Sequence, residues 1–337
     1  MISESNKLAE TGNSINKAKN LTAALNPGVP FSLDWLNTVC INQSAVERRV
    51  AILKASRSLK KQWQTAWLLK AVSCIDLTTL SGDDTPGRVK RLCGKAKNPV
   101  RADILEALGA QSLNLTTGAV CVYHSMVDVA VTALKGSDIP VAAVSTGFPA
   151  GMSPMATRLQ EIEASILAGA TEIDIVISRH FVLSKHWRAL FNEMCAYRKA
   201  CGQVHMKAII STGQLATLNN IACASMVCMM AGADFIKTST GMESSNATLT
   251  VSLVMLRMIR RYQELTGYKV GFKPAGGIST AKDALHYLVM VKEELGNDWL
   301  NPRMFRFGAS SLLGDIERQL EHQQSGYYSA SHYHPLV

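Results

Sequence analysis

The stretch ILAGATEIDIV, residues 166–176, returns in altered form as MMAGADFIKT at residues 229–238. In each copy a run with apolar residues at helical spacing stops at a glycine, Gly169 or Gly232, and a run typical of a β-strand follows within a few positions. Two copies of one helix-to-strand unit predict a chain in which helices and strands alternate.

Outward from these two units, the chain contains eight short apolar runs, most of them separated by an amphipathic helical stretch. The runs are VSCIDLT (72–78), AVCVY (119–123), VAAVST (141–146), EIDIVIS (172–178), HMKAIIS (205–211), DFIKTST (234–240), VGFKPAG (270–276) and RMFRFGA (303–309). Strands that are apolar on both faces and alternate with helices are typical of parallel sheets, and eight of them predict an α/β fold with a closed (β/α)8 TIM barrel. The alternative is a doubly wound open sheet, which is weakened by the lack of a dinucleotide-binding glycine fingerprint.

The rest of the 337-residue chain divides around this barrel. Residues 1–30 are polar and end in NPGVP, so we expect a mobile N-terminal tail there. Residues 31–70 carry apolar residues at helical spacing, which predicts a helical extension. The barrel itself is expected over residues 71–322, followed by a C-terminal tail over residues 323–337.

The composition is that of a packed globular protein, with 47% hydrophobic and 18% charged residues. A net charge of +9 can attract nucleic acid, but the basic residues occur at most in pairs and aromatic residues make up only 6%, so we expect no nucleic-acid partner. The eight cysteines form no C-x-x-C pair, which indicates reduced thiols in a cytoplasmic protein. We expect no signal peptide and no membrane span, because no apolar run approaches the about 18 residues that a span needs.

Reactive residue types interrupt the apolar runs. They are Asp76 and Thr78 in the first run, Cys121 in the second, Asp174 in the fourth, Lys207 in the fifth, Lys237 in the sixth and Lys273 in the seventh. Active residues of a barrel lie at the carboxyl ends of its strands, so a reactive lumen is predicted. Each residue alone has a structural alternative: a strand lysine is more often an ion-pair partner, Lys207 can pair with Asp174, and Cys121 can be a small core residue. The histidines lack metal-ligand spacing, so no metal site is predicted.

Three loops after the predicted strands are rich in glycine and serine. They are TSTG (238–241), PAGGIS (274–279) and FGASSLLGDIERQL (307–320), the last of which opens a helix that we expect Ser310 or Ser311 to cap. Backbone N–H groups at such places form the usual phosphate site of a barrel. The candidate binding residues are therefore Thr238, Gly241, Gly276, Gly277, Gly308, Ser310 and Ser311. The alternative is that these loops are only tight turns and helix caps.

Six segments together, CIDLTTL, AVCVY, TEIDIVI, ADFIKTSTG, VGFKPAGGI and RFGASSLL, resemble in order and spacing the motifs of the deoxyribose-phosphate aldolase family. The resemblance covers residues 68 to 322, and the helical N-terminal stretch resembles that of the longer, animal-type members. It implies a class I aldolase that needs no metal or cofactor. Such an enzyme cleaves 2-deoxyribose 5-phosphate reversibly to glyceraldehyde 3-phosphate and acetaldehyde in deoxynucleoside breakdown.

This resemblance also implies roles for single residues. Lys237 matches the lysine that forms the Schiff base, Lys273 matches the second lysine of GFKPAGG, and Asp174 matches the aspartate that works with it in proton transfer. A cation at Lys273 and an apolar wall would keep the Lys237 amine partly neutral. We expect Asp76 and Thr78 to orient substrate hydroxyls or the acid network, with Cys121 lining the pocket.

The sequence departs from the family pattern at three positions. Met242 stands where a lysine is usual, Ser279 where an arginine is usual, and His124 where proline is common. Losing two positive charges near the phosphate predicts weaker binding of a phosphorylated substrate. Two alternatives to the main reading follow: a Schiff-base aldolase that also accepts small unphosphorylated aldehydes, and a non-catalytic barrel that serves as a scaffold.

The C-terminal tail carries three tyrosines, and some family members end in a tyrosine that reaches the active site. Here Tyr327, Tyr328 or Tyr333 could take that role, and the sequence favours none of them. For partners we expect a small phosphorylated sugar as substrate and a homodimer.

Overall fold

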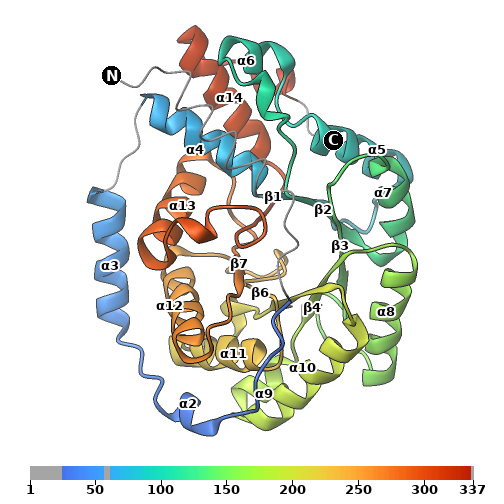
Figure 1. Ribbon diagram of the computed structural model, residues 1–337, viewed down its shortest axis with the longest axis vertical. Coiled ribbons are helices and arrows are strands. Elements are labelled where there is room, and N and C mark those ends of the chain that lie inside the picture. The colour runs from blue at the N-terminus through green and yellow to red at the C-terminus, as the bar shows by residue number, and fades with distance from the viewer. Residues whose placement is uncertain (1–24, 57–60, 335–337) are drawn as a thin grey trace.

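Eight parallel strands occupy the centre of the molecule, and helices surround them (Figure 1). The computed structural model describes residues 25–56 and 61–334. The strands are β1 (Ile75–Thr78), β2 (Ala119–Tyr123), β3 (Val141–Ser145), β4 (Glu172–Val176), β5 (His205–Ile209), β6 (Phe235–Lys237), β7 (Gly271–Lys273) and β8 (Phe307–Ala309). Each strand lies within one of the eight apolar runs, so the eight predicted strands are confirmed.

The order of the strands identifies the sheet as a barrel. Hydrogen bonds join them in the order β7-β6-β5-β4-β3-β2-β1-β8. Single bridges pair Phe272 with Phe305 and Ala275 with Gly308, which brings the two edges together. The predicted (β/α)8 barrel is therefore confirmed as a nearly closed sheet. The doubly wound alternative is wrong, because its strand order reverses at a switch point.

The helices of the described residues alternate with these strands and form the outer layer (Figure 1). They are α2 (Leu33–Asn37), α3 (Gln43–Ser56), α4 (Lys61–Ser73), α5 (Pro86–Lys97), α6 (Ala102–Ala107), α7 (Val127–Leu134), α8 (Met155–Leu167), α9 (Arg179–Leu183), α10 (Trp187–Cys201), α11 (Leu218–Met230), α12 (Leu249–Thr266), α13 (Ala281–Leu295) and α14 (Leu312–Ser325). Short 3₁₀ turns lie at Gln111–Leu113, His124–Met126, Thr212–Gln214, Asn297–Trp299 and Ser331–Tyr333.

The strand period of two separates an apolar layer from a polar lumen. In β1, Ile75 and Leu77 belong to the main apolar core between sheet and helices, while Asp76 between them is fully buried and bonds to charged groups inside the barrel. The repeated helix-to-strand unit behaves as the sequence predicts: α8 ends at Leu167, and Gly169 turns the chain with a φ of +101°. The barrel interior is thus available for chemistry.

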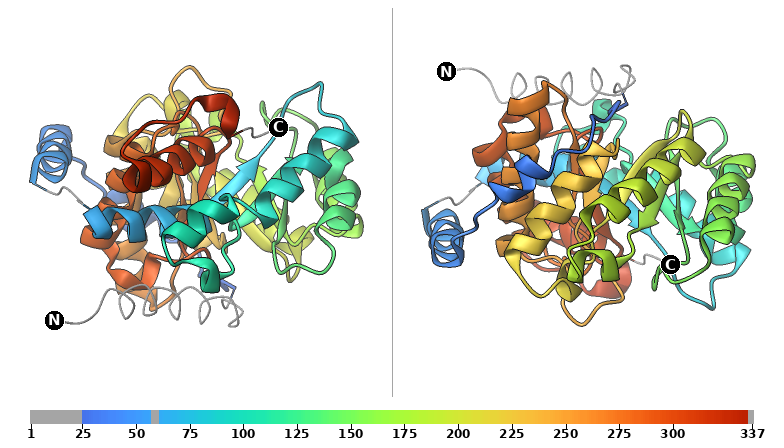
Figure 2. Two further views of the ribbon diagram at one scale, coloured as in Figure 1. Left: turned by 90° about the horizontal axis from the view of Figure 1, so that it is seen from above. Right: turned by 90° about the horizontal axis from the view of Figure 1, so that it is seen from below.

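The predicted N-terminal helical extension is confirmed and consists of α2, α3 and α4. Helix α3 packs against α12 and α13 and lies outside the ring of barrel helices (Figures 1 and 2). Its buried residues Val46, Val50 and Leu53 recur at helical spacing, which is the amphipathic pattern that predicts it.

Residues 25–30 pack against the base of the barrel instead of extending away from it. Asn26 is only 3% exposed, and its backbone N–H donates to Asp234 Oδ1 at 2.8 Å. Its side-chain amide donates to the carbonyls of Met229 and Ala233, at 2.8 and 2.9 Å. The segment therefore ties the end of α11 to the start of β6. The rest of the predicted mobile tail, residues 1–24, lies outside the described residues.

Replacing Asn26 by alanine should lower the free energy of unfolding by about 1–3 kcal/mol, because two buried backbone carbonyls lose their donor. Chemical denaturation of the purified variant measures this loss. Asn37→Ala, which removes the same group from an exposed position at the end of α2, is the control and should change stability by less than about 0.5 kcal/mol. Equal free energies of unfolding for the two variants would contradict a stabilising role for the Asn26 hydrogen bonds.

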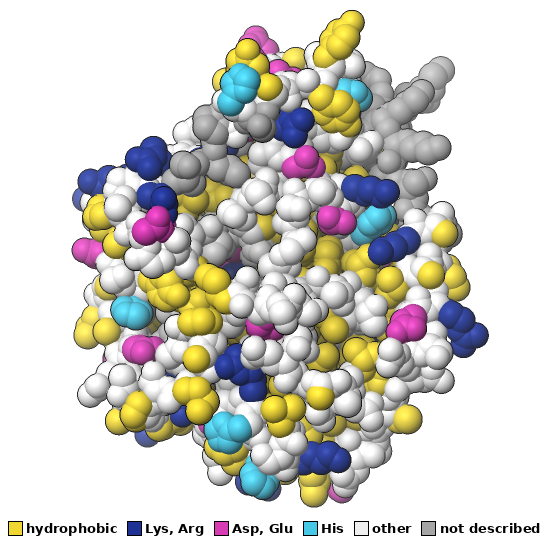
Figure 3. All heavy atoms as spheres, turned by 180° about the vertical axis from the view of Figure 1, so that it is seen from behind, with side chains coloured by type: hydrophobic (Ala, Val, Ile, Leu, Met, Phe, Trp, Pro, Cys, Tyr) yellow, Lys and Arg dark blue, Asp and Glu magenta, His cyan; other side chains and the backbone are white. Residues whose placement is uncertain are grey.

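The distribution of basic side chains on the outer surface can be followed on one face of the molecule. On the face shown in Figure 3, several Lys and Arg side chains lie close together at the upper left, and the others stand at separate positions with hydrophobic and polar groups between them. Within residues 25–56 and 61–334, none of the helices has the length and apolar character needed to cross a membrane.

Candidate active site

Seven charged side chains gather inside the barrel, most of them from inward-facing strand positions. They are Asp76 on β1, Glu172 and Asp174 on β4, Lys207 on β5, Lys237 on β6, Lys273 on β7 and Arg306 just before β8, and all are buried. Buried charges are costly unless they are paired, so their mutual geometry decides what this cluster can do.

Asp174 lies at the centre of the cluster and contacts three lysines. Its Oδ1 accepts from Lys207 Nζ at 2.7 Å, and its Oδ2 accepts from both Lys237 Nζ and Lys273 Nζ at 2.8 Å. The strand register explains this meeting, because Asp174 pairs with Lys207 across β4 and β5, and Lys237 with Lys273 across β6 and β7. The two lysines of β6 and β7 are thus separated by a single carboxylate oxygen.

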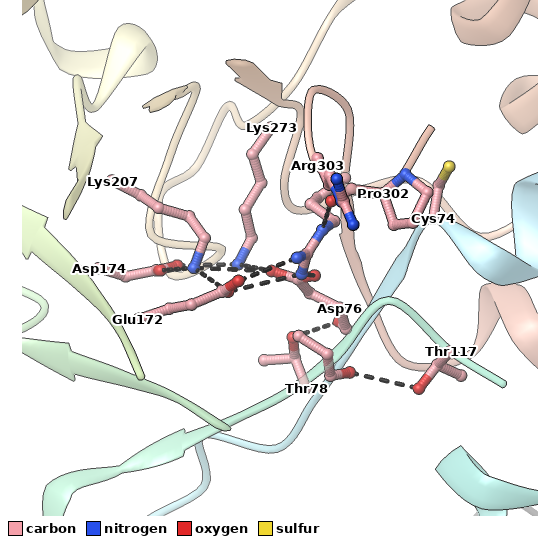
Figure 4. Close-up of polar contacts among 12 residues, drawn as sticks. Cys74, Asp76, Thr78, Thr117, Glu172, Asp174, Lys207, Lys273, Pro302 and Arg303 are labelled. Carbon is pink, nitrogen blue, oxygen red and sulfur yellow. Dashed lines mark hydrogen bonds and ion pairs between the residues drawn. The ribbon is translucent and has the colours of Figure 1, made fainter. Parts of the chain in front are cut away.

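Two further carboxylates link this centre to Arg306. Asp76 accepts from Arg306 Nη1 at 2.5 Å with one oxygen and from Lys273 Nζ at 2.5 Å with the other. Glu172 in the same way joins Arg306 Nη2, at 2.9 Å, to Lys207 Nζ, at 2.6 Å. Figure 4 shows these contacts as one continuous network across the lumen.

The network leaves one lysine less firmly charged than the others. Lys207 contacts Glu172 and Asp174 closely, with Asp76 farther away at 4.0 Å, and Lys273 contacts Asp76 and Asp174. Among the described carboxylates, Lys237 contacts only Asp174. Burial lowers the pKa of Lys237, and the Lys273 ammonium lowers it further, although Asp174 opposes both. Burial also disfavours the charge on Lys273, but Asp174 and Asp76 together raise its pKa above the ordinary lysine value.

Charge balance supports the same assignment. The cluster contains three carboxylates and four basic groups, so it holds one excess positive charge when every group is ionised. Burial alone would raise the pKa of Asp174, but Lys207, Lys237 and Lys273 hold it well below its usual range. The proton that leaves most readily is therefore that of Lys237, and its loss makes the cluster neutral.

A cavity of about 330 Å³ opens above Lys237 at the carboxyl ends of the strands. Its walls are Thr78, Leu80 and the loops after β6, β7 and β8, at residues 240–242, 275–279 and 308–311. Lys237 is the one basic side chain among these lining residues, while Asp174 and Lys273 lie beneath it. A carbonyl compound in this cavity would meet an amine with a lowered pKa.

The loops at the cavity mouth present backbone N–H groups. Gly276 and Gly277 both have a φ of +78°, a conformation that favours glycine. Within residues 25–56 and 61–334, the N–H groups of Gly277, Ser279, Ser310 and Ser311 have no acceptor. Such groups beside the start of α14 suit an anion. Ser311 occupies the N-cap position, as predicted, but its side chain makes no capping hydrogen bond, so that part of the prediction is wrong.

Some predicted site residues lie away from the cavity. The hydroxyl of Thr238 accepts a hydrogen bond from the backbone N–H of Ala275 at 2.9 Å. Cys121 is buried in a small apolar cluster, and burial raises its thiol pKa. Lys207 pairs with Asp174, which is the structural alternative that the sequence left open. Thr78, by contrast, does line the cavity, and its hydroxyl donates a hydrogen bond to the backbone carbonyl of Asp76 at 2.7 Å.

Two members of the network, Glu172 and Arg306, were not predicted as site residues. Glu172 precedes Asp174 by two positions on β4 and therefore faces the same side, which is a signal that the sequence contains. Arg306 lies before β8 begins, and its role depends on its reach to β1 and β4. Sequence spacing alone does not reveal that reach.

The C-terminal tyrosines lie outside the cavity. Tyr327, Tyr328 and Tyr333 are exposed, and none of them is a lining residue. The Tyr328 hydroxyl donates to Gln319 of α14 at 3.0 Å. Farther along the tail, the buried His334 contacts Glu321 through Nε2 at 2.8 Å. In this structure the described part of the tail is thus folded back on α14.

Comparisons with known proteins bear on this geometry. A family model described as "DeoC/LacD family aldolase" matches residues 70–316. The chain is 57% identical to the deoxyribose-phosphate aldolase of Mus musculus over 311 residues, which cover 92% of this chain and 98% of that one. It is 55% identical to that of Homo sapiens over 316 residues, or 93% and 99% of the two chains. Among solved structures, the tetrameric deoxyribose phosphate aldolase of Aeropyrum pernix has the same fold, with a TM-score of 0.56 at 21% identity over 83% of this chain and 99% of that one.

Proposed function

Because the chain belongs to the DeoC/LacD family of aldolases, we propose that it cleaves 2-deoxyribose 5-phosphate reversibly to glyceraldehyde 3-phosphate and acetaldehyde through a Schiff base on Lys237. The observation that supports this most is the Lys237 amine itself, which lies at the floor of the cavity with a lowered pKa and one carboxylate contact. The high identity to mammalian deoxyribose-phosphate aldolases over nearly the whole chain supports the substrate.

The first step is attack of neutral Lys237 on the C1 aldehyde. A free lysine has a pKa of about 10.4, so little of it is neutral at pH 7, and the buried, cation-flanked site increases that fraction. Loss of water from the adduct gives a protonated imine. Asp174 contacts both lysine amines through one oxygen, so it is placed to pass protons between Lys237 and Lys273 during this step.

Bond cleavage uses the imine as an electron sink. A base removes the proton of the C3 hydroxyl, the C2–C3 bond breaks, and its electron pair forms an enamine while glyceraldehyde 3-phosphate leaves. The enamine then takes a proton at C2, and water hydrolyses the new imine to release acetaldehyde and free Lys237. Lys273, whose pKa is raised by Asp174 and Asp76 despite its burial, is a proton donor within the same network. We assign these proton transfers to Asp174 and Lys273.

The phosphate fits the mouth of the cavity. The loops that carry Gly277, Ser310 and Ser311 offer N–H groups and hydroxyls rather than charges, while the N–H groups of Gly276 and Gly308 donate to backbone carbonyls within the same loops. Dipoles of this kind at a helix start bind phosphate, with less attraction than cations would add.

A second candidate activity acts on unphosphorylated aldehydes. The observation that favours it is the uncharged rim, where Met242 is 53% exposed and Ser279 also lines the cavity. A substrate without phosphate loses little electrostatic attraction in such a site, so discrimination between the two sugars should be small.

Adding charge to the rim should restore phosphate selectivity. In the double variant Met242→Lys, Ser279→Arg, we expect the KM for 2-deoxyribose 5-phosphate to fall about tenfold, since two exposed charge contacts contribute about 0.5–1 kcal/mol each. The KM for unphosphorylated 2-deoxyribose should stay unchanged. The matched control is Met242→Gln, Ser279→Gln, which lengthens the rim without charge. A KM for the phosphorylated sugar that is the same in both double variants would contradict an electrostatic deficit at this rim.

A trapping experiment tests the main proposal. The folded protein is mixed with 2-deoxyribose 5-phosphate, reduced with borohydride and digested, and the modified peptide is located by mass. Unphosphorylated 2-deoxyribose is run beside it over a concentration series. We expect an adduct on Lys237 and none on Lys207 or Lys273. Absence of an adduct with either sugar would overturn the aldolase proposal and leave a non-catalytic barrel.

The proposal also includes a cytoplasmic location and a homodimer. All eight cysteines are free thiols, which suits a reducing compartment. Sedimentation of the purified protein over a range of concentrations measures the oligomeric state.

A further inference from the structure

A second cavity lies at the opposite end of the barrel from Lys237. It has a volume of about 390 Å³ and opens between the loops that precede β2, β3 and β8, at residues 114–118, 136–140 and 302–306. Ser73, at the end of α4, completes the wall. The cavity is therefore beneath the strands, and the Schiff-base chemistry does not use it.

Two arginines face this cavity. Arg303 is half-buried, and within the described residues no carboxylate lies within ion-pair distance of its side chain. Partial burial lowers the pKa of Arg303, so its charge is partly desolvated and uncompensated. Asp138, the one acidic residue of the wall, is exposed at the rim. A guanidinium in such a place suits an anion, which it can bind with two parallel hydrogen bonds.

Arg306 forms the inner wall and belongs also to the charged network. Its Nη1 and Nη2 hold Asp76 and Glu172, and its Nε donates to the carbonyl of Pro302. Gly118 lies against it, and a Cβ at that position would be 3.2 Å from Arg306 Cδ and 2.9 Å from the Ser73 carbonyl. Glycine is what allows the arginine to pass between the cavity and the lumen. Figure 4 shows Pro302 and Arg303 at one end of the network and Asp174 and Lys207 at the other.

We propose that the cavity at the base of the barrel binds a small phosphate-like anion through Arg303 and Arg306, and that the bound anion slows Schiff-base formation at Lys237. The route is a series of ion pairs, from Arg306 to Asp76, from Asp76 to Lys273, from Lys273 to Asp174, and from Asp174 to Lys237. None of these four ion pairs is longer than 2.8 Å.

The direction of the effect follows from charge. An anion that shares the donors of Arg306 leaves Asp76 and Glu172 less neutralised. Asp76 and Glu172 then form stronger ion pairs with Lys273 and Lys207. Asp174 loses part of its contact with those two lysines, so its ion pair with Lys237 becomes stronger. A stronger Asp174–Lys237 ion pair favours the charged amine, which cannot attack a carbonyl. The base cavity would thus act as an inhibitory site.

Phosphate can also enter the upper cavity, so binding is measured with that site blocked. Ser311→Asp places a negative charge at the mouth above Lys237 and serves as the parent protein. Inorganic phosphate is titrated by calorimetry into this parent and into three derivatives that add Arg303→Gln, Arg48→Gln or Asp138→Asn. Arg48 is exposed on α3, which packs on α12 and α13, so its variant removes the same charge at a remote place.

We expect the parent to bind one phosphate, Arg303→Gln to bind it at least about tenfold more weakly, and Arg48→Gln to bind it unchanged. Asp138→Asn, which removes the repelling charge, should bind it a few-fold more tightly. Equal affinities for Arg303→Gln and Arg48→Gln, or a parent that binds no phosphate, would overturn the site. If Arg303→Gln does not fold, an unchanged affinity in Asp138→Asn overturns it instead.

The inhibitory effect is measured in the protein with an unaltered Ser311 and rests on the proposed Schiff base. Phosphate should slow borohydride trapping of Lys237 by 2-deoxyribose about fivefold more in this protein than in Arg303→Gln. Equal slowing in the two proteins would overturn the coupling. Because the titration needs no turnover, a failure of the aldolase proposal would not be confused with a failure of this site.

Discussion

The Lys237→Met variant should lose at least about 10⁴-fold in kcat/KM, while its free energy of unfolding stays within about 1 kcal/mol of that of the unaltered protein. Methionine fills the space of the lysine stem but offers no amine, so no imine can form. The stability is preserved because Asp174 remains held by Lys207 and Lys273, at 2.7 and 2.8 Å. The cluster then contains as many cations as carboxylates.

The measurement pairs steady-state kinetics with chemical denaturation on one preparation. Lys273→Met is the matched comparison, since Lys273 contacts two carboxylates and its loss leaves Asp76 with Lys207 at 4.0 Å as its nearest lysine. We expect that variant to be clearly less stable than Lys237→Met. If Lys237→Met kept measurable turnover, or if it were the less stable of the two, Lys237 would not be the weakly held amine that carries the chemistry.

Asp174→Asn should impair both folding and turnover. Three lysines lose their shared carboxylate, and breaking a buried ion pair by removing one partner costs about 3–5 kcal/mol. Loss of the proton relay should lower kcat about 10²- to 10⁴-fold. Schiff-base formation itself should survive, because without Asp174 the amine of Lys237 becomes neutral more readily. Borohydride should therefore still trap an adduct on Lys237 in a protein that hardly turns over.

Glu172→Gln is the control for this prediction. It removes another buried carboxylate of β4, but one that contacts Lys207 and Arg306 instead of Lys237 or Lys273. Its loss of stability should be comparable, and its loss of kcat should be less than about tenfold. Similar kcat values in the two variants would show that Asp174 acts only by supporting the fold.

The stability provided by Asp174 should also depend on pH. Its pKa is well below the ordinary value in the folded protein, so its contribution is fully present above about pH 4, near the pKa of an unfolded aspartate, and is lost as pH falls towards the folded-state pKa. The difference in free energy of unfolding between the unaltered protein and Asp174→Asn should therefore shrink in acid.

Much of the fold could be predicted because its signal is local. Runs such as EIDIV and DFIKT are apolar, short and bounded by glycine, so the strands β4 and β6 follow from periodicity and helix ends. The packing of residues 25–30 could not be predicted, because it depends on carbonyls at residues 229 and 233 that are far away in the chain. From its polar composition alone, such a segment is predicted to be a mobile tail.

The site divides in the same way. Lys237, Lys273 and Asp174 lie on inward positions of predicted strands, and the structure brings them together on one oxygen. Glu172 shares a face with Asp174 and was within reach of the same reasoning. Arg306 was not, because its partners lie on β1 and β4, and a long side chain outside a strand can point in many directions. Thr238 is held by the backbone of Ala275, and Cys121 lies among apolar neighbours, so neither borders the cavity.

The packing of residue 26 sets the smallest piece of this protein that should fold by itself. The family match begins at residue 70, yet the strand that carries Lys237 is held at its start by Asn26, through Asp234 and Ala233. A truncated version that starts at the barrel would expose those bonding groups and the faces of α12 and α13 that α3 covers. Shortened versions for crystallisation or directed evolution should therefore begin before residue 26, since Asn26 stabilises the barrel although three helices separate it from the first strand.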